Sequence, residues 1–316
     1  MNIPDPTPVF ETYWRFAAER HRIYEKRLAG DPQPWTADPI LGQYKFTNVF
    51  RAADRVSQYL IKDVIYEPTA STDPEEVVFR VLIFKLFNSI PAWEVLKAKF
   101  GIPTWKGFNE HAYAVELGIA KANGVKIWNP AYMQKPQYRE DLPAKHERYL
   151  ALLKYMMDDR VGQKLVAAKS YRQAYGILRG YPLYGDFLAM QHLTDINYSE
   201  VIDFGEDDFI VPGPGCYEGM EKCFGFRPTP EQARIILEDF VTNQDDHLKD
   251  VGEQPIRLQG KRKLHAIDCQ NLFCEVGKYA REAHPEFNLK RTEIKQKLKP
   301  AGPLPPPFFP AKWGLK

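Results

Sequence analysis

The sequence predicts an all-α fold, and three observations lead to that prediction. The chain has 316 residues, of which 44% are hydrophobic and 13% aromatic, enough to bury one large core or two moderate ones. The apolar residues recur mostly at helical spacing, and few stretches alternate as β-strands do. Glycine and proline interrupt this pattern at points where helices would end. We therefore expect helices packed on helices.

The first predicted helix covers about residues 8–28, and the second covers about residues 48–66. Phe10, Tyr13 and Phe16 begin the apolar stripe of the first helix. Asn48 is the expected N-cap of the second. Both helices therefore present an apolar face to a core.

A strongly apolar core helix is expected at residues 75–89, opened by Pro74 in its first turn. Further helices are predicted at residues 91–100, 106–123, 142–166, 170–179, 185–197, 215–224, 230–242, 266–284 and 289–298. Residues 300–316 are too rich in proline for a helix, so we expect them to cross the surface as an extended tail.

The charge is distributed unevenly along the chain. The formal net charge is +2, but residues 195–250 hold fourteen acidic and four basic side chains. Residues 251–316 hold thirteen basic and six acidic side chains. The second of these blocks can meet a polyanion.

The four cysteines fit neither a disulfide-stapled secreted domain nor a zinc or iron–sulfur site, because their spacing matches none of these. We expect them to be buried thiols. The histidines show no paired metal-ligand spacing, so no metal and no cofactor are expected. We see neither a signal peptide nor an apolar run long enough to span a bilayer, and therefore expect a cytoplasmic protein without a membrane partner.

The segment at residues 209–220 contains an apolar-Pro-Gly-x-Gly turn, which we expect to join two short helices. Gly213 and Gly215 let the backbone approach a phosphate, and the N-terminus of the following helix supplies hydrogen-bond donors. An ordinary helix–helix connection explains the same residues. The turn alone does not decide between these interpretations.

Asp268 stands at the head of the predicted helix at residues 266–284. A carboxylate there could stabilise an oxocarbenium-like sugar and orient a water molecule. It could equally cap the helix, because Asp is favoured at helix starts.

The glycine hairpin followed by this acid resembles the helix-hairpin-helix DNA glycosylases. In those enzymes the hairpin grips the DNA backbone and an aspartate faces the extruded nucleotide, so the resemblance implies that Asp268 is catalytic. Tyr217 occupies the place where strand-cutting members carry a lysine, so no lyase activity is expected. The gap between Gly215 and Asp268 is longer than in compact glycosylases and requires an insertion over residues 228–259.

Four blocks, at residues 44–60, 84–88, 195–199 and 267–275, carry a narrower resemblance. They are similar to the α-glutamyl/putrescinyl thymine pyrophosphorylase group, which is related to the helical domain of 5-hydroxymethyl-deoxyuridine DNA kinases. Some members of the broader group look like anti-phage glycosylases that excise glucosylated hydroxymethylcytosine. The resemblance implies an enzyme that acts on a modified base in DNA.

Such an enzyme must take its target base out of the stack and hold it in a pocket. The candidate pocket residues are polar or aromatic side chains near the four blocks: Gln191, Asp195, Asn197, Tyr198, Asn48, Arg51, Arg55, Gln270 and Asn271. The candidate contacts to the DNA backbone are Gly213, Gly215, Lys222, Lys261, Arg262 and Lys263.

These observations predict a monofunctional DNA glycosylase that hydrolyses the N-glycosidic bond of a 5-substituted pyrimidine, such as glucosylated hydroxymethylcytosine. It would leave an abasic site in phage DNA as a defence. Two alternatives remain: a hypermodification enzyme that substitutes at the pyrimidine 5-methylene carbon, and a non-catalytic reader of modified DNA. No obligatory protein partner is implied.

We expect three segments along the chain. Residues 1–40 form an N-terminal helix and loop, residues 41–299 form the catalytic unit, and residues 300–316 form the tail. Within the catalytic unit, the helix-hairpin-helix lies at about residues 205–225 and the catalytic helix at about residues 266–284.

Overall fold

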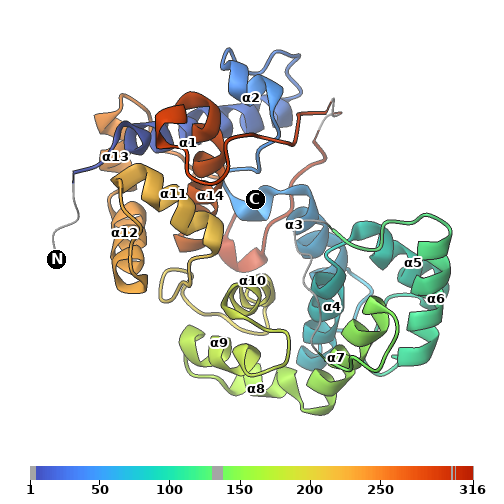
Figure 1. Ribbon diagram of the computed structural model, residues 1–316. Coiled ribbons are helices and arrows are strands. Elements are labelled where there is room, and N and C mark those ends of the chain that lie inside the picture. The colour runs from blue at the N-terminus through green and yellow to red at the C-terminus, as the bar shows by residue number, and fades with distance from the viewer. Residues whose placement is uncertain (1–4, 130–137, 300–301, 303, 316) are drawn as a thin grey trace. The chain divides into compact units, whose positions relative to one another are not determined.

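The computed structural model describes residues 5–129, 138–299, 302 and 304–315, and within them every regular element is helical (Figure 1). The predicted all-α class is confirmed. Pairing of extended backbone among the described residues is limited to two isolated bridges, Tyr44 with Lys297 and Leu258 with Arg262.

The chain divides into two compact units. Unit 1 comprises Met1–Asp54, Ile210–Pro307 and Trp313–Lys316, and unit 2 comprises Arg55–Phe209 and Phe308–Lys312. This division differs from the segments expected to meet at residues 40 and 299, because the first helix packs with the C-terminal third of the chain.

Unit 1 is built around its longest C-terminal helix. Its elements are α1 (Pro8–Ala29), α2 (Pro39–Gln43), η1 (Arg51–Ala53), α11 (Pro214–Phe224), α12 (Pro230–Thr242), α13 (Gln244–Asp250), α14 (Ala266–Ala283) and η4 (Pro285–Phe287). Helices α1, α11 and α12 all pack against α14 (Figure 1). Rings of Tyr13, Trp14, Phe240 and Phe273 pack against one another in edge-to-face, tilted or stacked arrangements, which fixes the position of α14.

Unit 2 is built around α4. Its helices are α3 (Arg55–Tyr59), the π-helix η2 (Leu60–Ile65), α4 (Pro74–Phe87), α5 (Ile90–Phe100), α6 (Glu110–Ala122), α7 (Lys145–Asp158), α8 (Val161–Ala167), α9 (Tyr171–Arg179) and α10 (Asp186–Ile196). Residues 77–87 of α4 are all buried, as an apolar composition on every face predicts. A short 3₁₀ turn, η5 (Ala311–Trp313), lies in the tail.

The predicted helix at residues 48–66 is wrong at its start. Asn48 does not cap a helix, because its Oδ1 accepts a hydrogen bond from Arg20 and its Nδ2 donates to the Ala53 carbonyl. The α-helix begins at Arg55 and continues as a π-helix from Leu60.

Two further helical predictions are wrong. No helix precedes the glycine turn in the described chain between Ile196 and Pro214, since Pro212 lacks a backbone N–H and three adjacent acids repel one another. Residues 289–298 are also not helical. Their backbone bonds to residues 43–45 instead, and one of these bonds runs from Lys45 N to Gln296 O at 2.9 Å.

Candidate functional site

Asp268 lies at the third position of α14 and serves as a local cap. Its Oδ2 accepts a hydrogen bond from the backbone N–H of His265 at 3.2 Å. Its Oδ1 accepts one from the backbone N–H of Arg51 at 2.8 Å. The carboxylate therefore completes the start of α14 and fastens the first residue of η1 to it.

The net effect of its surroundings is to raise the pKa of the Asp268 carboxyl group. The residue is 4% exposed, and burial raises its pKa. The charges of Arg262 and His265 and the hydrogen bond from Arg51 oppose that rise. A carboxylate held in this way can accept a proton more readily than an exposed one.

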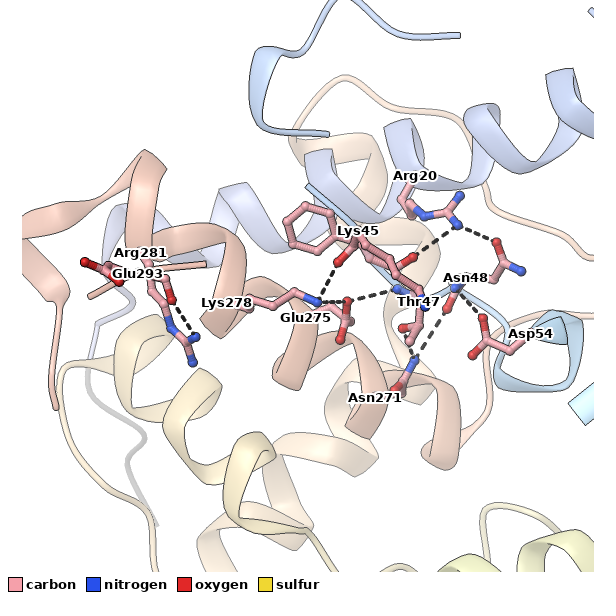
Figure 2. A network of polar contacts seen from close by, with 11 residues as sticks. Arg20, Lys45, Thr47, Asn48, Asp54, Asn271, Glu275, Lys278, Arg281 and Glu293 are labelled. Atoms are coloured by element: carbon pink, nitrogen blue, oxygen red, sulfur yellow. Dashed lines mark hydrogen bonds and ion pairs between the residues drawn. The ribbon is translucent and has the colours of Figure 1, made fainter. Parts of the chain in front are cut away.

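The loop at residues 44–54 is held by Arg20 of α1 and by a hydrogen bond within the loop itself (Figure 2). Arg20 donates to Asn48 Oδ1 at 2.6 Å, and the Asn48 backbone N–H donates to Asp54 Oδ1 at 2.8 Å. Burial raises the pKa of Asp54 to about 7 and lowers the pKa of Arg20 to about 10. Asp54 is thus poised to change its protonation state near neutrality.

Helix α14 holds the same loop from the other side (Figure 2). Asn271 donates to Thr47 Oγ1 at 3.0 Å, and Glu275 Oε2 accepts from the Thr47 N–H at 3.0 Å. Lys278 pairs with Glu275 at 2.7 Å and donates to the Lys45 carbonyl at 2.9 Å. Residues 44–54 of the first sequence block and the block at residues 267–275 therefore meet in unit 1 through a polar network.

Gln270 lies in the same turn of α14 as Asp268. It is 3% exposed, and its Oε1 has no hydrogen-bond partner among the described residues. A buried acceptor without a donor is uncommon in folded proteins.

The glycines of the predicted phosphate grip lie where α11 meets α14. Gly213 is the N-cap of α11, and a Cβ atom on Gly215 would lie 3.0 Å from Cys274 Sγ. One turn on, a Cβ atom on Gly219 would overlap the Phe273 carbonyl group. Gly215 and Gly219 thus allow α11 and α14 to pack closely. This agrees with the second interpretation of the turn, an ordinary connection between helices. A phosphate-binding role for Gly213 and Gly215 stays a prediction.

The predicted basic contacts divide into buried and exposed groups. Lys222 is 1% exposed and donates to the Gly277 carbonyl and to Asn288 Oδ1, each at 3.0 Å. The structure therefore places its ammonium group inside unit 1 and not on a surface that meets phosphate. Lys261 and Lys263 are exposed. Arg262, between them, is half-buried, and its guanidinium lies 3.5 Å from the ring centroid of Trp313.

The remaining candidate residues belong to unit 2. Asp195 is fully buried, and Lys85 Nζ lies 3.1 Å from its Oδ2. Lys85 also donates to Asn88 Oδ1 at 2.9 Å. The blocks at residues 84–88 and 195–199 therefore meet at this ion pair.

The neighbours of Asp195 have mixed roles. Asn197 forms reciprocal hydrogen bonds with the backbone of Phe204 and so closes the loop after α10. Gln191 and Tyr198 are buried, whereas Arg55 is exposed at the start of α3. The proposed grouping of these residues with Asp268 in one pocket stays a prediction.

Sequence reasoning missed Arg20 and Lys85. Arg20 falls on the same stripe of α1 as Tyr13 and Phe16, and Lys85 interrupts the apolar run of α4. A charged residue on a face that must be buried signals a buried partner.

Three of the four cysteines are buried, as expected, whereas Cys274 is half-buried; all four are free thiols. In the described part of the chain, no group of three or more His, Cys, Asp and Glu side chains is arranged to hold a metal ion. None of the helices described there is both long and apolar enough to cross a bilayer.

The chain is thus all-helical in its described parts and has two buried polar centres. One is the network around Asn48 and Asp268 in unit 1, and the other is the ion pair of Lys85 and Asp195 in unit 2. A family model described as "5-hmdU DNA kinase, helical domain" matches residues 7–289, so the chain belongs to this family. The 5-hmdU DNA kinase of Bacillus phage SP10 is 24% identical over 306 residues. That alignment covers 90% of this chain and 46% of the phage protein, so the chain spans about half the length of this relative. No solved structure matches.

These comparisons correct the predicted activity. The family and the phage relative are named for a DNA kinase, a transferase, so the prediction of an N-glycosidic hydrolase that leaves abasic sites is wrong. A kinase transfers a phosphoryl group and leaves the bond between base and sugar intact. The predicted role in phage defence depended on base excision, so that prediction is wrong as well. The alternative of chemistry at the modified base fits these findings better.

Proposed function

We propose that this chain binds DNA containing a pyrimidine enlarged at its 5-position and takes part in modifying that substituent. The observation that carries the proposal is the family match over residues 7–289, together with a relative that is named for action on 5-hmdU in DNA. Because the match is to the helical domain, the proposal concerns recognition of the base and substitution at its 5-methylene carbon. Phosphoryl transfer is not assigned to this chain.

The polar centre of unit 1 supports this proposal. A base that is reached by an enzyme must leave the stack, and its edge must then be matched by protein donors and acceptors. Gln270 offers a buried acceptor oxygen without a partner among the described residues, and Asp268 lies two residues away with its pKa raised. Because residues two apart on a helix do not face each other, they are separate candidates: Gln270 as an acceptor for a base N–H, and Asp268 as a proton acceptor.

The proposed reaction replaces a pyrophosphate at the 5-methylene carbon by an amine, with Asp268 as the proton acceptor. An amine attacks the 5-methylene carbon and forms a C–N bond, while the C–O bond to a pyrophosphate breaks and the pyrophosphate leaves. The proton lost by the amine passes to the Asp268 carboxylate, which burial makes a better base. Asp195 and Gln191 of unit 2, with Asn197, Tyr198 and Arg55, stay candidates for contacts to the base or the strand.

A second candidate function is recognition of the modified base without turnover. The observation that favours it is that the matching family model describes a helical domain and not a whole kinase. A domain that supplies only binding would show the same base preference and no change of the DNA.

Mass spectrometry of nucleosides tests the proposal. Oligonucleotides that differ only in one base (thymine, 5-hydroxymethyluracil or its pyrophosphorylated form) are incubated with the protein and an amine donor. We expect a mass change at the 5-substituent with the nucleoside intact, and we expect Asp268→Asn to abolish it while DNA binding persists. Binding with base preference but no mass change supports the reader instead. Equal binding to all three DNAs without a mass change, or release of a free base, contradicts both functions.

A further inference from the structure

The segment Asn288–Lys299, which we call the lysine strap, is strongly basic. Its single acidic residue is Glu293. Its five basic residues are all exposed: Lys290, Arg291, Lys295, Lys297 and Lys299. The sequence pattern predicts a helix here, but the segment runs without helical structure along unit 1.

The backbone of the strap is anchored at both ends. Asn288 donates to the Arg281 carbonyl at 3.0 Å and accepts from the buried Lys222. Further on, Ile294 is 5% exposed, and Leu298 N donates to the Gln43 carbonyl at 2.8 Å. Because the main chain is fixed, the exposed side chains present their charges from a defined position.

The charges of the strap are not neutralised within the described part of the chain. Among those residues, no carboxylate oxygen lies within 4.0 Å of any of its five basic groups. Elsewhere in unit 1, Arg22 pairs with Glu253 at 2.6 Å and Arg257 with Asp245 at 2.5 Å. A run of like charges without partners costs free energy unless a polyanion neutralises it.

The spacing of the charges suits a nucleic-acid backbone. Around the bridge between Tyr44 and Lys297, Lys295, Lys297 and Lys299 occupy alternate positions, and Ile294 is buried. Alternate residues of an extended chain lie on one side and about 6–7 Å apart. Successive phosphates along a strand are separated by a comparable distance.

We infer that the lysine strap binds the phosphate backbone of the DNA strand, independently of base identity. This inference rests on the proposed function, because it takes DNA as the partner. Phosphate contacts fix the register of a protein on DNA, whereas contacts to the base supply specificity. The strap would therefore contribute affinity, and the preference for a modified base would come from elsewhere in the chain.

Fluorescence anisotropy over a salt series tests the inference with the full chain. The strap variant is K295Q/K297Q/K299Q, and the matched control is K106Q/K121Q/K126Q, which removes the same charge from lysines of unit 2. Thermal melting of both variants verifies that they remain folded. The probes are duplexes with thymine or 5-hydroxymethyluracil at one position.

We expect the strap variant to bind both probes about tenfold more weakly at about 0.1 M salt, with a salt slope reduced by about 0.9 for each phosphate that the strap no longer neutralises. The control variant should keep the slope of the wild type. A strap variant with the slope and affinity of the wild type overturns the inference, even if the preference for 5-hydroxymethyluracil persists. A reduced slope without any base preference in the wild type supports the strap and contradicts the proposed function. A wild-type protein that binds neither probe overturns both.

Discussion

Each unit buries one of the candidate carboxylates, Asp268 in unit 1 and Asp195 in unit 2, and the two are stabilised in different ways. Asp268 lies in the first turn of α14, where two backbone N–H groups and the positive end of the helix dipole stabilise its charge. Asp195 lies in the last turn of α10, where the dipole opposes a negative charge, and it has the ammonium group of Lys85 beside it. A carboxylate at a helix start can be satisfied by nearby backbone, whereas one at a helix end requires a cation from another helix.

The largest effect is expected from Lys85→Met in unit 2. Removing one partner of a buried ion pair leaves an uncompensated charge, which costs about 3–5 kcal/mol of unfolding free energy. Urea unfolding measures this cost. The double variant Lys85→Met/Asp195→Leu should recover much of the loss, because no buried charge then remains. If Lys85→Met lowers the unfolding free energy by less than about 1 kcal/mol, the ion pair contributes little to the stability of unit 2.

Gly219→Ala is expected to destabilise unit 1 by about 1–3 kcal/mol, because the added methyl group overlaps the Phe273 carbonyl and pushes α11 from α14. The matched control is Gly176→Ala in α9 of unit 2, where no heavy atom lies within 4 Å of the added Cβ. That change should raise the stability by about 0.5–1 kcal/mol. Differential scanning calorimetry compares the two. Equal effects would contradict the close packing of α11 on α14.

Asp268→Asn should cost about 1–2 kcal/mol, because an amide can accept only one of the two backbone hydrogen bonds and turns its NH₂ group toward the other donor. Chemical denaturation gives the value. Asp268→Ala, which leaves both donors buried without an acceptor, should cost more. If Asn and Ala variants were as stable as the wild type, the carboxylate would not be fastening residues 47–54 to α14.

A pH dependence of the unfolding free energy is expected to reside in Asp54. Burial raises the pKa of this group from 3.8 to about 7, so the folded chain binds the proton more tightly than the unfolded chain does. The stability contributed by Asp54 is therefore complete below about pH 4 and is lost as the pH rises to about 7. Asp54→Asn should flatten the fall in unfolding free energy over this range. Urea unfolding at several pH values measures the change of unfolding free energy with pH. If this change were the same in the variant and the wild type, the assignment to Asp54 would be contradicted.

The sequence predicts the helices of this chain better than its loops. The helix at α4 is apolar on every face and α1 carries a regular stripe, so both appear within a few residues of their predicted bounds. Residues 289–298 also carry helix formers, yet they bond to residues 43–45, which are distant in sequence. Local pattern cannot reveal a partner of that kind.

The candidate site shows the same limit. The position of Asp268 at the head of a helix followed from its neighbours in the sequence, and both the capping and the catalytic interpretations were available from it. The meeting of Asp268 with Arg51, and of Lys85 with Asp195, depends on tertiary packing. Gly215 has two uses that look alike in sequence, an anion site or a close helix contact, and only the neighbouring Cys274 shows that the helix contact is made.

The most direct test of the proposed function is the ratio of two dissociation constants, measured by anisotropy at one salt concentration. The two probes are identical duplexes with either thymine or 5-hydroxymethyluracil at a single position. We expect tighter binding to the modified duplex by a factor of about ten, because one well-matched polar contact to the base is gained. A ratio of one, with the protein folded and binding both duplexes, would contradict it.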